Sequence, residues 1–167
     1  NVENMGVLKN IRQSIANNFL NKKLQHLNTD KAIGKFKFND VKTVGILFDA
    51  SNAEDFELVK RYFIYLREQA KKVKVIGFFS KKQIPEFTYS KLDFNFFTLK
   101  EINWFGKPTT DFINNFASEE YDLLIDLNIH DHFALKYIAA ISNAKFKVGK
   151  YKQNDERIYD MMIDADN

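Results

Sequence analysis

Residues 121–151 read YDLLIDLNIHDHFALKYIAAISNAKFKVGKY. An apolar run suited to a strand is followed by a polar turn, an amphipathic helical pattern, a short stop of small residues and a second strand-like run. A strand, a helix and a strand in this order are typical of a parallel βαβ unit. This stretch therefore predicts an α/β fold.

The same alternation extends through the rest of the chain. Residues 41–49 and 73–80 form nearly continuous apolar runs, which are typical of parallel strands buried on both faces. A helical pattern separates them, and further strands are expected at 94–99 and 158–164. The expected fold is a three-layer, doubly wound and mostly parallel sheet of five or six strands.

An additional helix is expected before the sheet. Apolar residues recur at steps of three and four between residues 5 and 27, first as Leu8, Ile11, Ile15 and Phe19 and then as Leu20, Leu24 and Leu27. We therefore divide a single-domain chain into a basic N-terminal helix with its link, residues 1–40, and a Rossmann-like α/β part, residues 41–167.

Composition excludes several classes of protein. The chain has 167 residues and no cysteine, which excludes disulfides, thiolate catalysis and cysteine-ligated zinc. Its longest apolar runs have the length of strands, and its N-terminus has no signal-peptide pattern. We expect a cytoplasmic protein.

Charge is distributed unevenly along the chain. The net charge is +3, but residues 1–42 carry eight basic and three acidic side chains, so this part is net +5 and the remainder is net −2. A basic segment on a slightly acidic body favours a polyanionic or acidic partner. A solvated helix face is the alternative explanation.

The turn after the first expected strand does not fit a nucleotide cofactor. Residues 49–55 read DASNAED, with no glycine to admit a phosphate and three carboxylates that would repel one. There is also no G-x-S-x-G nucleophile motif. We expect no cofactor, no catalytic residue and no hydrolase activity.

Polar residues nevertheless follow the expected central strands. The candidates for a strand-end pocket are Asp49, Ser51, Asp126, Asn128 and His130. Two close carboxylates bind Mg²⁺ or share a proton, whereas single carboxylates in such turns often cap a turn or a helix.

A histidine pair lies close to this expected pocket. His130 and His132 would share a face on a strand but diverge at the start of a helix. Because the only other histidine, His26, is distant in the sequence, we expect no metal site there.

The segment Trp104-Phe105-Gly106-Lys107 is the best candidate for a surface contact. An exposed aromatic pair beside a lysine can stack on a base, a sugar or a partner protein. We expect the alternative, in which the loop folds over the sheet edge with its aromatic rings buried. Together with the basic helix, the partner-binding candidates are Lys9, Arg12, Lys22, Lys23, Trp104, Phe105 and Lys107.

Residues 121–151 also carry a local resemblance. The D-L-x-I-D-L strand and the following Ala/Leu-rich helix resemble part of the N-terminal domain of heptosyltransferase-type glycosyltransferases. The likeness covers about thirty residues and rests mostly on the fold. It implies a nucleotide-sugar-binding fold, but in those enzymes most of the nucleotide-sugar site lies in a second, catalytic half, which we do not expect here.

The whole chain resembles an uncharacterised family of small bacterial Rossmann-like proteins. The segments that carry this likeness are Met5–Lys9, Val41–Gly45, Trp104–Pro108, Tyr121–Ile125 and Asn143–Gly149. The resemblance implies a domain of unknown function that usually continues into a C-terminal helix. It assigns no catalytic residue.

These observations lead to two functional hypotheses. The first is a non-catalytic cytoplasmic binding module for RNA, for a ribonucleoprotein such as the ribosome, or for an acidic protein surface. Because lysine far outnumbers arginine, any contact with nucleic acid should follow the phosphate backbone rather than read bases. The second is a small glycosyltransferase-like or ligand-binding domain that takes a nucleotide sugar or Mg²⁺ at the strand ends.

Overall fold

The protein is an α/β domain built on one parallel sheet. The computed structural model describes residues 2–25, 36–85 and 94–164. In chain order, the helices and strands are α1 (Val2–Gln25), the 3₁₀ turn η1 (Phe38–Asp40), β1 (Thr43–Asp49), α2 (Ala53–Glu68), β2 (Lys72–Phe79), β3 (Phe94–Thr98), the 3₁₀ turn η3 (Leu99–Glu101), α3 (Asp111–Ser118), β4 (Tyr121–Leu127), α4 (Phe133–Ile141), β5 (Ala144–Lys150) and β6 (Met161–Ile163).

The sheet confirms the predicted fold class. Its six strands are all parallel and lie in the order β3-β2-β1-β4-β5-β6. The chain builds outward in one direction from β1 and then returns to start β4 on the other side of it. Ligands of doubly wound sheets usually bind at this reversal, outside the carboxyl ends of the strands.

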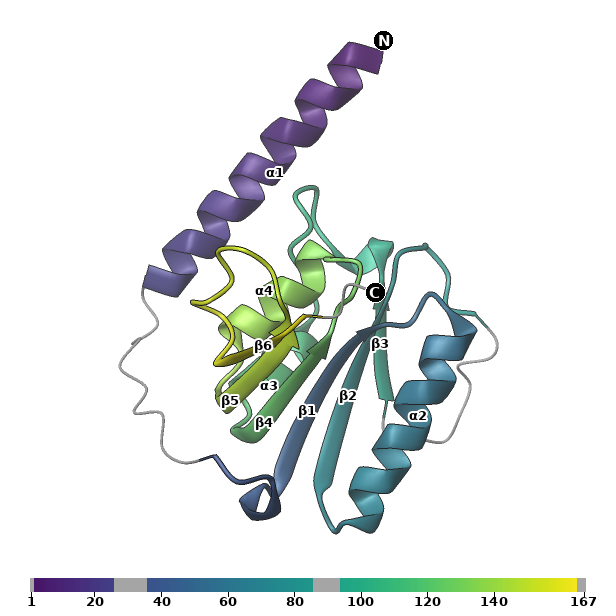
Figure 1. Cartoon of the computed structure of the whole chain (residues 1–167). Helices are drawn as coiled ribbons and strands as arrows, with labels where there is room; N and C mark the ends of the chain where they lie inside the picture. Colours follow the sequence, from purple (N-terminus) through teal and green to yellow (C-terminus); the bar gives the residue numbers. More distant parts are fainter. Residues whose placement is uncertain (1, 26–35, 86–93, 165–167) are drawn as a thin grey trace.

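Helices cover both faces of the sheet, which gives the expected three layers (Figure 1). The helix α2 lies on one face, and α3 and α4 lie on the other. The helix α1 packs against the outside of α4, and its N-terminal part extends beyond the body of the domain. No helix in the described ranges is long and apolar enough to cross a membrane.

The face under α2 is packed with aromatic rings. Phe48 and Phe56 are almost fully buried there and contact Phe94 and Phe96 from β3. Asn52 caps α2, because its side chain accepts a hydrogen bond of 2.8 Å from the backbone N–H of Glu54.

The face under α4 buries polar groups as well as apolar ones. Asp126, Asn128 and Asp155 are each less than 9% exposed on this side. Lys147 is 5% exposed and donates to the carbonyl oxygens of Ala139 and Ala140 in α4. Buried polar groups are costly unless they are paired, so their concentration here makes this face the more suitable one for a functional site.

The helix α1 differs in one respect from the sequence prediction. Its contact face consists of Ala16, Leu20 and Leu24, which are buried, whereas Ile11 and Ile15 are 48% and 38% exposed. The spacing of four that joins the buried residues follows the ridge that meets α4. Ile11 and Ile15 lie on the opposite side of α1, and Leu27 falls outside the described residues.

Candidate functional sites

The first candidate site lies where the strand order reverses between β1 and β4. Asp49 ends β1, and its Oδ2 atom lies 2.9 Å from Nε2 of His132, the residue that precedes α4. Asn128 follows β4 and holds His132 through two hydrogen bonds, since its Oδ1 accepts from the backbone N–H and its Nδ2 donates to the carbonyl oxygen. Asp49, Asn128 and His132 therefore share one strand-end site.

Asp49 is held as a carboxylate. Partial burial alone would raise its pKa, but hydrogen bonds from His132 and from the side chain and backbone of Ser51 lower the pKa to about 2. The Asp49 side chain is 11% exposed and that of His132 is 26% exposed, so solvent reaches the imidazole. The site thus offers the Asp49 carboxylate and, beside it, a solvent-accessible imidazole ring.

Ser51 contacts the next strand rather than the histidine. Its hydroxyl lies 3.0 Å from that of Ser80 and accepts a hydrogen bond from the backbone N–H of Ser80. No hydrogen bond joins Ser51 to His132 among the described residues. The three side chains Ser51, His132 and Asp49 thus lack the relay geometry of a nucleophile triad.

Asp126 is enclosed beneath this site. Its Oδ2 accepts a hydrogen bond of 2.6 Å from the Tyr159 hydroxyl, and its Oδ1 accepts from the backbone N–H of Asn128. Desolvation by burial raises the pKa of Asp126 to about 6, although these hydrogen bonds and the charge of Lys136 oppose the rise.

The two aspartates do not act as a pair. Their strands are neighbours, as predicted, but Asp126 binds Tyr159 while Asp49 binds His132. His130 is exposed, and its ring lies 6.2 Å from that of His132. In the part of the chain that the structure describes, no three metal-ligating side chains come together.

The second candidate site begins with a tight loop at residues 102–108. A bridge between Ile102 and Pro108 closes the loop, and Oδ1 of Asn103 accepts hydrogen bonds from the backbone N–H groups of Phe105 and Lys107. Gly106 has a φ of 97°, which side-chain-bearing residues rarely adopt. The loop is therefore fixed by its own hydrogen bonds.

Trp104 lies exposed at the tip of this loop, so the expectation that it is buried is wrong. It is 62% exposed, because the turn at Asn103 directs it outward while the half-buried Phe105 makes the inward contact. The ring of Phe105 lies 5.5 Å from that of Phe19 in α1 and 5.6 Å from that of Trp104. The loop is thus joined to α1 through aromatic rings.

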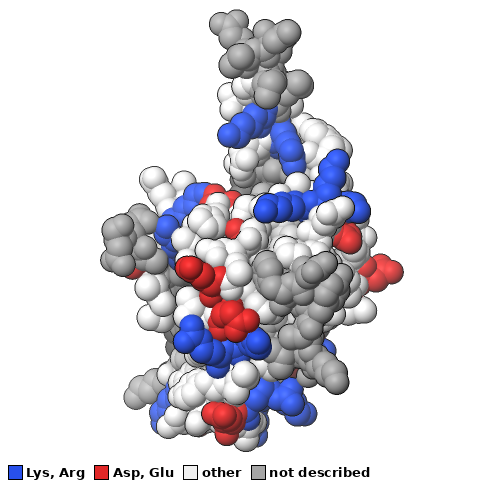
Figure 2. Space-filling view, turned by 90° about the vertical axis from the view of Figure 1, so that its right-hand side faces the viewer, with Lys and Arg blue, Asp and Glu red and all other residues white. Residues whose placement is uncertain are grey.

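Basic side chains surround this junction. The Lys107 ammonium lies 5.2 Å from the ring centre of Phe19. Arg12, Phe19 and Lys23 are separated by steps of seven and four, so they lie along one flank of α1. Figure 2 shows basic side chains on the projecting helix and on the body directly below it.

We call this group the α1–loop surface, which consists of Arg12, Phe19, Lys23 and the loop residues Trp104, Phe105 and Lys107. Lys22 lies instead on the outer side of α1, in line with Ile11 and Ile15. Lys9 is exposed and lies in α1 on the N-terminal side of Ala16, Leu20 and Leu24.

Comparison with known proteins gives a family without an assigned activity. Residues 12–167 match the model described as a family of unknown function (DUF6913). The chain belongs to this family. No curated protein and no solved structure matches it. The match includes both candidate sites and assigns a role to neither.

Two residues of these sites were missed by the sequence analysis. His132 was considered only as half of a metal-binding pair, although its place just before a helix and four residues after Asn128 suits a contact at the strand ends. Tyr159 gave no signal, because its contact with Asp126 joins residues 33 positions apart through an irregular segment.

Proposed function

We propose that this protein is a non-catalytic binding module that holds single-stranded RNA by its phosphate backbone on the α1–loop surface, without reading sequence. A cytoplasmic location follows from this proposal, and the resemblance described above favours a bacterial source. The acidic protein partner considered from the sequence is an alternative outcome of the test below.

The observation that carries the proposal is the contact between Phe19 and Phe105. It brings the exposed Trp104 beside the basic flank of α1, although the two segments lie far apart in the sequence. Non-specific binders of single strands combine cations that follow the backbone with aromatic rings on which bases stack. Both parts are present on one surface.

The cations on this surface are available to a ligand. Within the described ranges, neither Arg12 nor Lys23 nor Lys107 forms an ion pair. Lys107 faces the rings of Phe19 and Tyr137 instead. Binding a phosphate would therefore break no internal ion pair.

Fluorescence anisotropy with a labelled oligouridylate of about 12 nucleotides tests the proposal, since this length lies within the site sizes of single-strand binders. Three phosphate contacts should give a slope of log K against log salt of roughly −2 between about 50 and 200 mM salt. Other sequences of equal length should bind within about threefold, apart from any preference of the cavity described below. Weak, salt-insensitive binding would contradict the proposal.

Two neighbouring lysines provide a matched control. Lys23→Gln should weaken binding and reduce the salt slope by about 0.7, because it removes one phosphate contact. Lys22→Gln changes the same charge on the outer side of α1 and should have little effect. Equal losses would show that binding follows net charge rather than this surface. Binding to an acidic polypeptide but not to RNA would replace RNA with the alternative partner.

A second candidate function is favoured by one observation, the Asp49–His132 hydrogen bond at the reversal of strand order. A small ligand bound there, such as a nucleotide sugar with Mg²⁺, would meet Asp49, Asn128 and His132. Thermal unfolding in the presence of nucleotide sugars and divalent metals tests this hypothesis. A ligand at about 100 times its Kd raises the free energy of unfolding by about 2.7 kcal/mol. No change across the panel would exclude it.

A further inference from the structure

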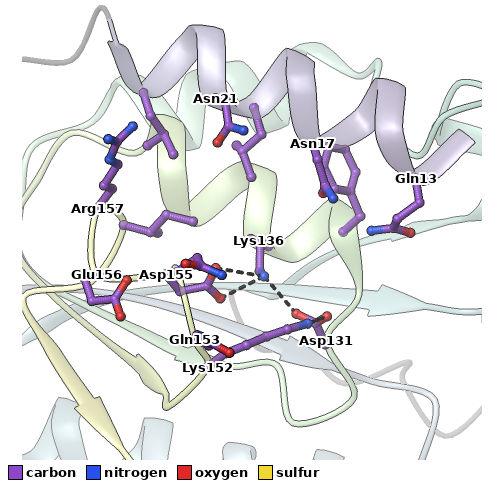
Figure 3. Close-up of a pocket in the computed structure, with 15 residues that line it drawn as sticks. Gln13, Asn17, Asn21, Asp131, Lys136, Lys152, Gln153, Asp155, Glu156 and Arg157 are labelled. Carbon is purple, nitrogen blue, oxygen red and sulfur yellow. Dashed lines mark hydrogen bonds and ion pairs between the residues drawn. The ribbon is translucent and has the colours of Figure 1, made fainter. Parts of the chain in front are cut away.

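A cavity of about 570 Å³ lies between α1, the start of α4 and the segment 152–158 (Figure 3). Its size is within the range of pockets that hold small molecules. It lies on the other side of the buried stripe of α1 from Arg12 and Lys23, so it is separate from the surface proposed to bind RNA.

One wall of the cavity is a row of carboxamides. Gln13, Asn17 and Asn21 follow one another at steps of four along α1, and all three point into the cavity (Figure 3). Gln153 and Asn154 line it from the opposite segment. No side-chain hydrogen bond occupies the three α1 carboxamides within the described residues, so their donors and acceptors are open to a ligand.

The charged residues of the cavity neutralise one another. Lys136 lies 2.7 Å from a carboxylate oxygen of Asp155 and 3.1 Å from one of Asp131, which also pairs with Lys152. Glu156 and Arg157 add one charge of each sign at the rim. The lining therefore has no net charge and favours a neutral ligand, because an ion would gain little and lose its hydration.

The inner wall of the cavity is apolar. Leu20, Leu24 and Ile158 are each at most 6% exposed and line it together with the half-buried Phe133. These side chains offer a surface to the face of a ring, while the carboxamides meet its edge. A flat, neutral, hydrogen-bonding heterocycle matches both parts.

We propose that this cavity binds a neutral nucleobase of the adenine type, as a free nucleoside or as an unstacked base of a nucleic-acid strand. A carboxamide presents a donor and an acceptor side by side, and asparagine or glutamine pairs in this way with the edge of adenine. Successive carboxamides of α1 are about 6 Å apart, so neighbouring ones reach different positions of the ligand.

Calorimetric titration of the full chain with adenosine tests the proposal. Adenosine should bind more tightly than uridine, and AMP should bind about as well as adenosine, because the cavity adds no attraction for phosphate. Glucose serves as the carbohydrate probe and should not bind. No binding of adenosine, or equal binding of glucose, would overturn the proposal.

Adjacent asparagines supply the matched variants. Asn17→Leu removes the central carboxamide and should weaken adenosine binding at least about tenfold. Asn18→Leu makes the same change at an exposed position outside the cavity and should leave binding within about twofold of the original. The isosteric Asn17→Asp, which removes the donor, should also weaken binding. Unchanged binding in both Asn17 variants would refute the assignment.

Comparing the affinities of oligoadenylate and oligouridylate shows whether the base comes from a nucleic-acid strand or from a free nucleoside. If oligoadenylate binds more tightly than oligouridylate, and Asn17→Leu abolishes only that preference, the ligand is a base of the strand. If adenosine binds but oligoadenylate and oligouridylate bind with equal affinity, the ligand is a free nucleoside. The oligouridylate experiments with Lys22 and Lys23 do not depend on the cavity, so either proposal can fail alone.

Discussion

The two faces of the sheet have different compositions and different uses. The face under α2 is packed with aromatic rings, and among its buried side chains Thr98 at the end of β3 is polar. The face under α4 encloses Asp126, Asn128 and Lys147 and carries a cavity toward α1. Apolar packing stabilises without providing a group that could recognise a ligand, so the α2 face should act as a support and the α4 face as the binding side.

The largest effect on stability is expected on the α2 face. Phe56 is 1% exposed and contacts Phe48 and Phe94, so Phe56→Ala should destabilise the fold by about 3–5 kcal/mol. Urea unfolding measures the loss. Under conditions where the variant remains folded, its affinity for oligouridylate should be unchanged. A loss of affinity in the folded variant would show that binding also depends on the α2 face.

The next largest effect is expected from Asp126, on the other face. Its pKa of about 6 lies above that of an unfolded aspartate, so the folded state binds more protons between about pH 4 and 6. The contribution of Asp126 to the stability of the fold is therefore favourable below about pH 4 and is lost as the pH rises through 6. About two pKa units correspond to about 3 kcal/mol.

The variant Asp126→Asn should remove this dependence. It cannot ionise, and its remaining oxygen can still accept a hydrogen bond from Tyr159 or Asn128. The difference in unfolding free energy between variant and original should grow from near zero at about pH 4 to about 3 kcal/mol above pH 6, in favour of Asn. A difference that is constant with pH would show that Asp126 stays in one protonation state.

The sequence predicts some of this arrangement. The carboxyl ends of parallel strands share one edge, so the nearness of Asp49 to Asn128 follows from the apolar runs alone. The absence of glycine after β1 likewise excludes the usual phosphate loops. Patterns within one element, or between adjacent strands, determine these features.

Contacts between segments that are distant in the sequence cannot be predicted from such patterns. The α1–loop surface depends on Phe19 meeting Phe105, and no local pattern joins these two residues. The cavity depends on which side of α1 meets α4: of the predicted apolar pattern, Leu20 and Leu24 make the contact together with Ala16, whereas Ile11 and Ile15 do not. A helix with apolar residues on several sides has a packing face that only its partner selects.

Asp49 provides a smaller effect with the opposite dependence on pH. Its pKa of about 2 lies below that of an unfolded aspartate, so its stabilisation is present above about pH 4 and is lost as the pH falls through 2. Asp49→Asn should cost about 2 kcal/mol at neutral pH by weakening the hydrogen bond with His132. The cost should vanish near about pH 2 in chemical unfolding experiments.

A smaller loss of stability is expected for Gly106→Ala in the loop. The φ of 97° is unfavourable for alanine, and an added Cβ would lie 3.2 Å from a ring atom of Phe133. The expected cost is about 1–2 kcal/mol. Because the turn also orients Trp104, affinity for oligouridylate should fall as well. Lost stability with full affinity would show that loop geometry is not needed for binding.

The smallest effect on stability is expected for Trp104→Ala, and it completes the comparison. Trp104 is 62% exposed and contacts Phe105 at an edge, so its removal should change the unfolding free energy by less than about 0.5 kcal/mol. If a base stacks on its ring, the same variant should lose about 1–3 kcal/mol of binding free energy, which anisotropy measures. Trp104→Phe, which keeps a stacking ring, should retain most of the affinity.

Phe56→Ala and Trp104→Ala should then have opposite effects. Phe56→Ala loses stability but keeps its affinity, and Trp104→Ala loses affinity but keeps its stability. If Trp104→Ala binds RNA as well as the original, the exposed ring is not part of the binding surface, and the proposal would rest on the basic residues alone.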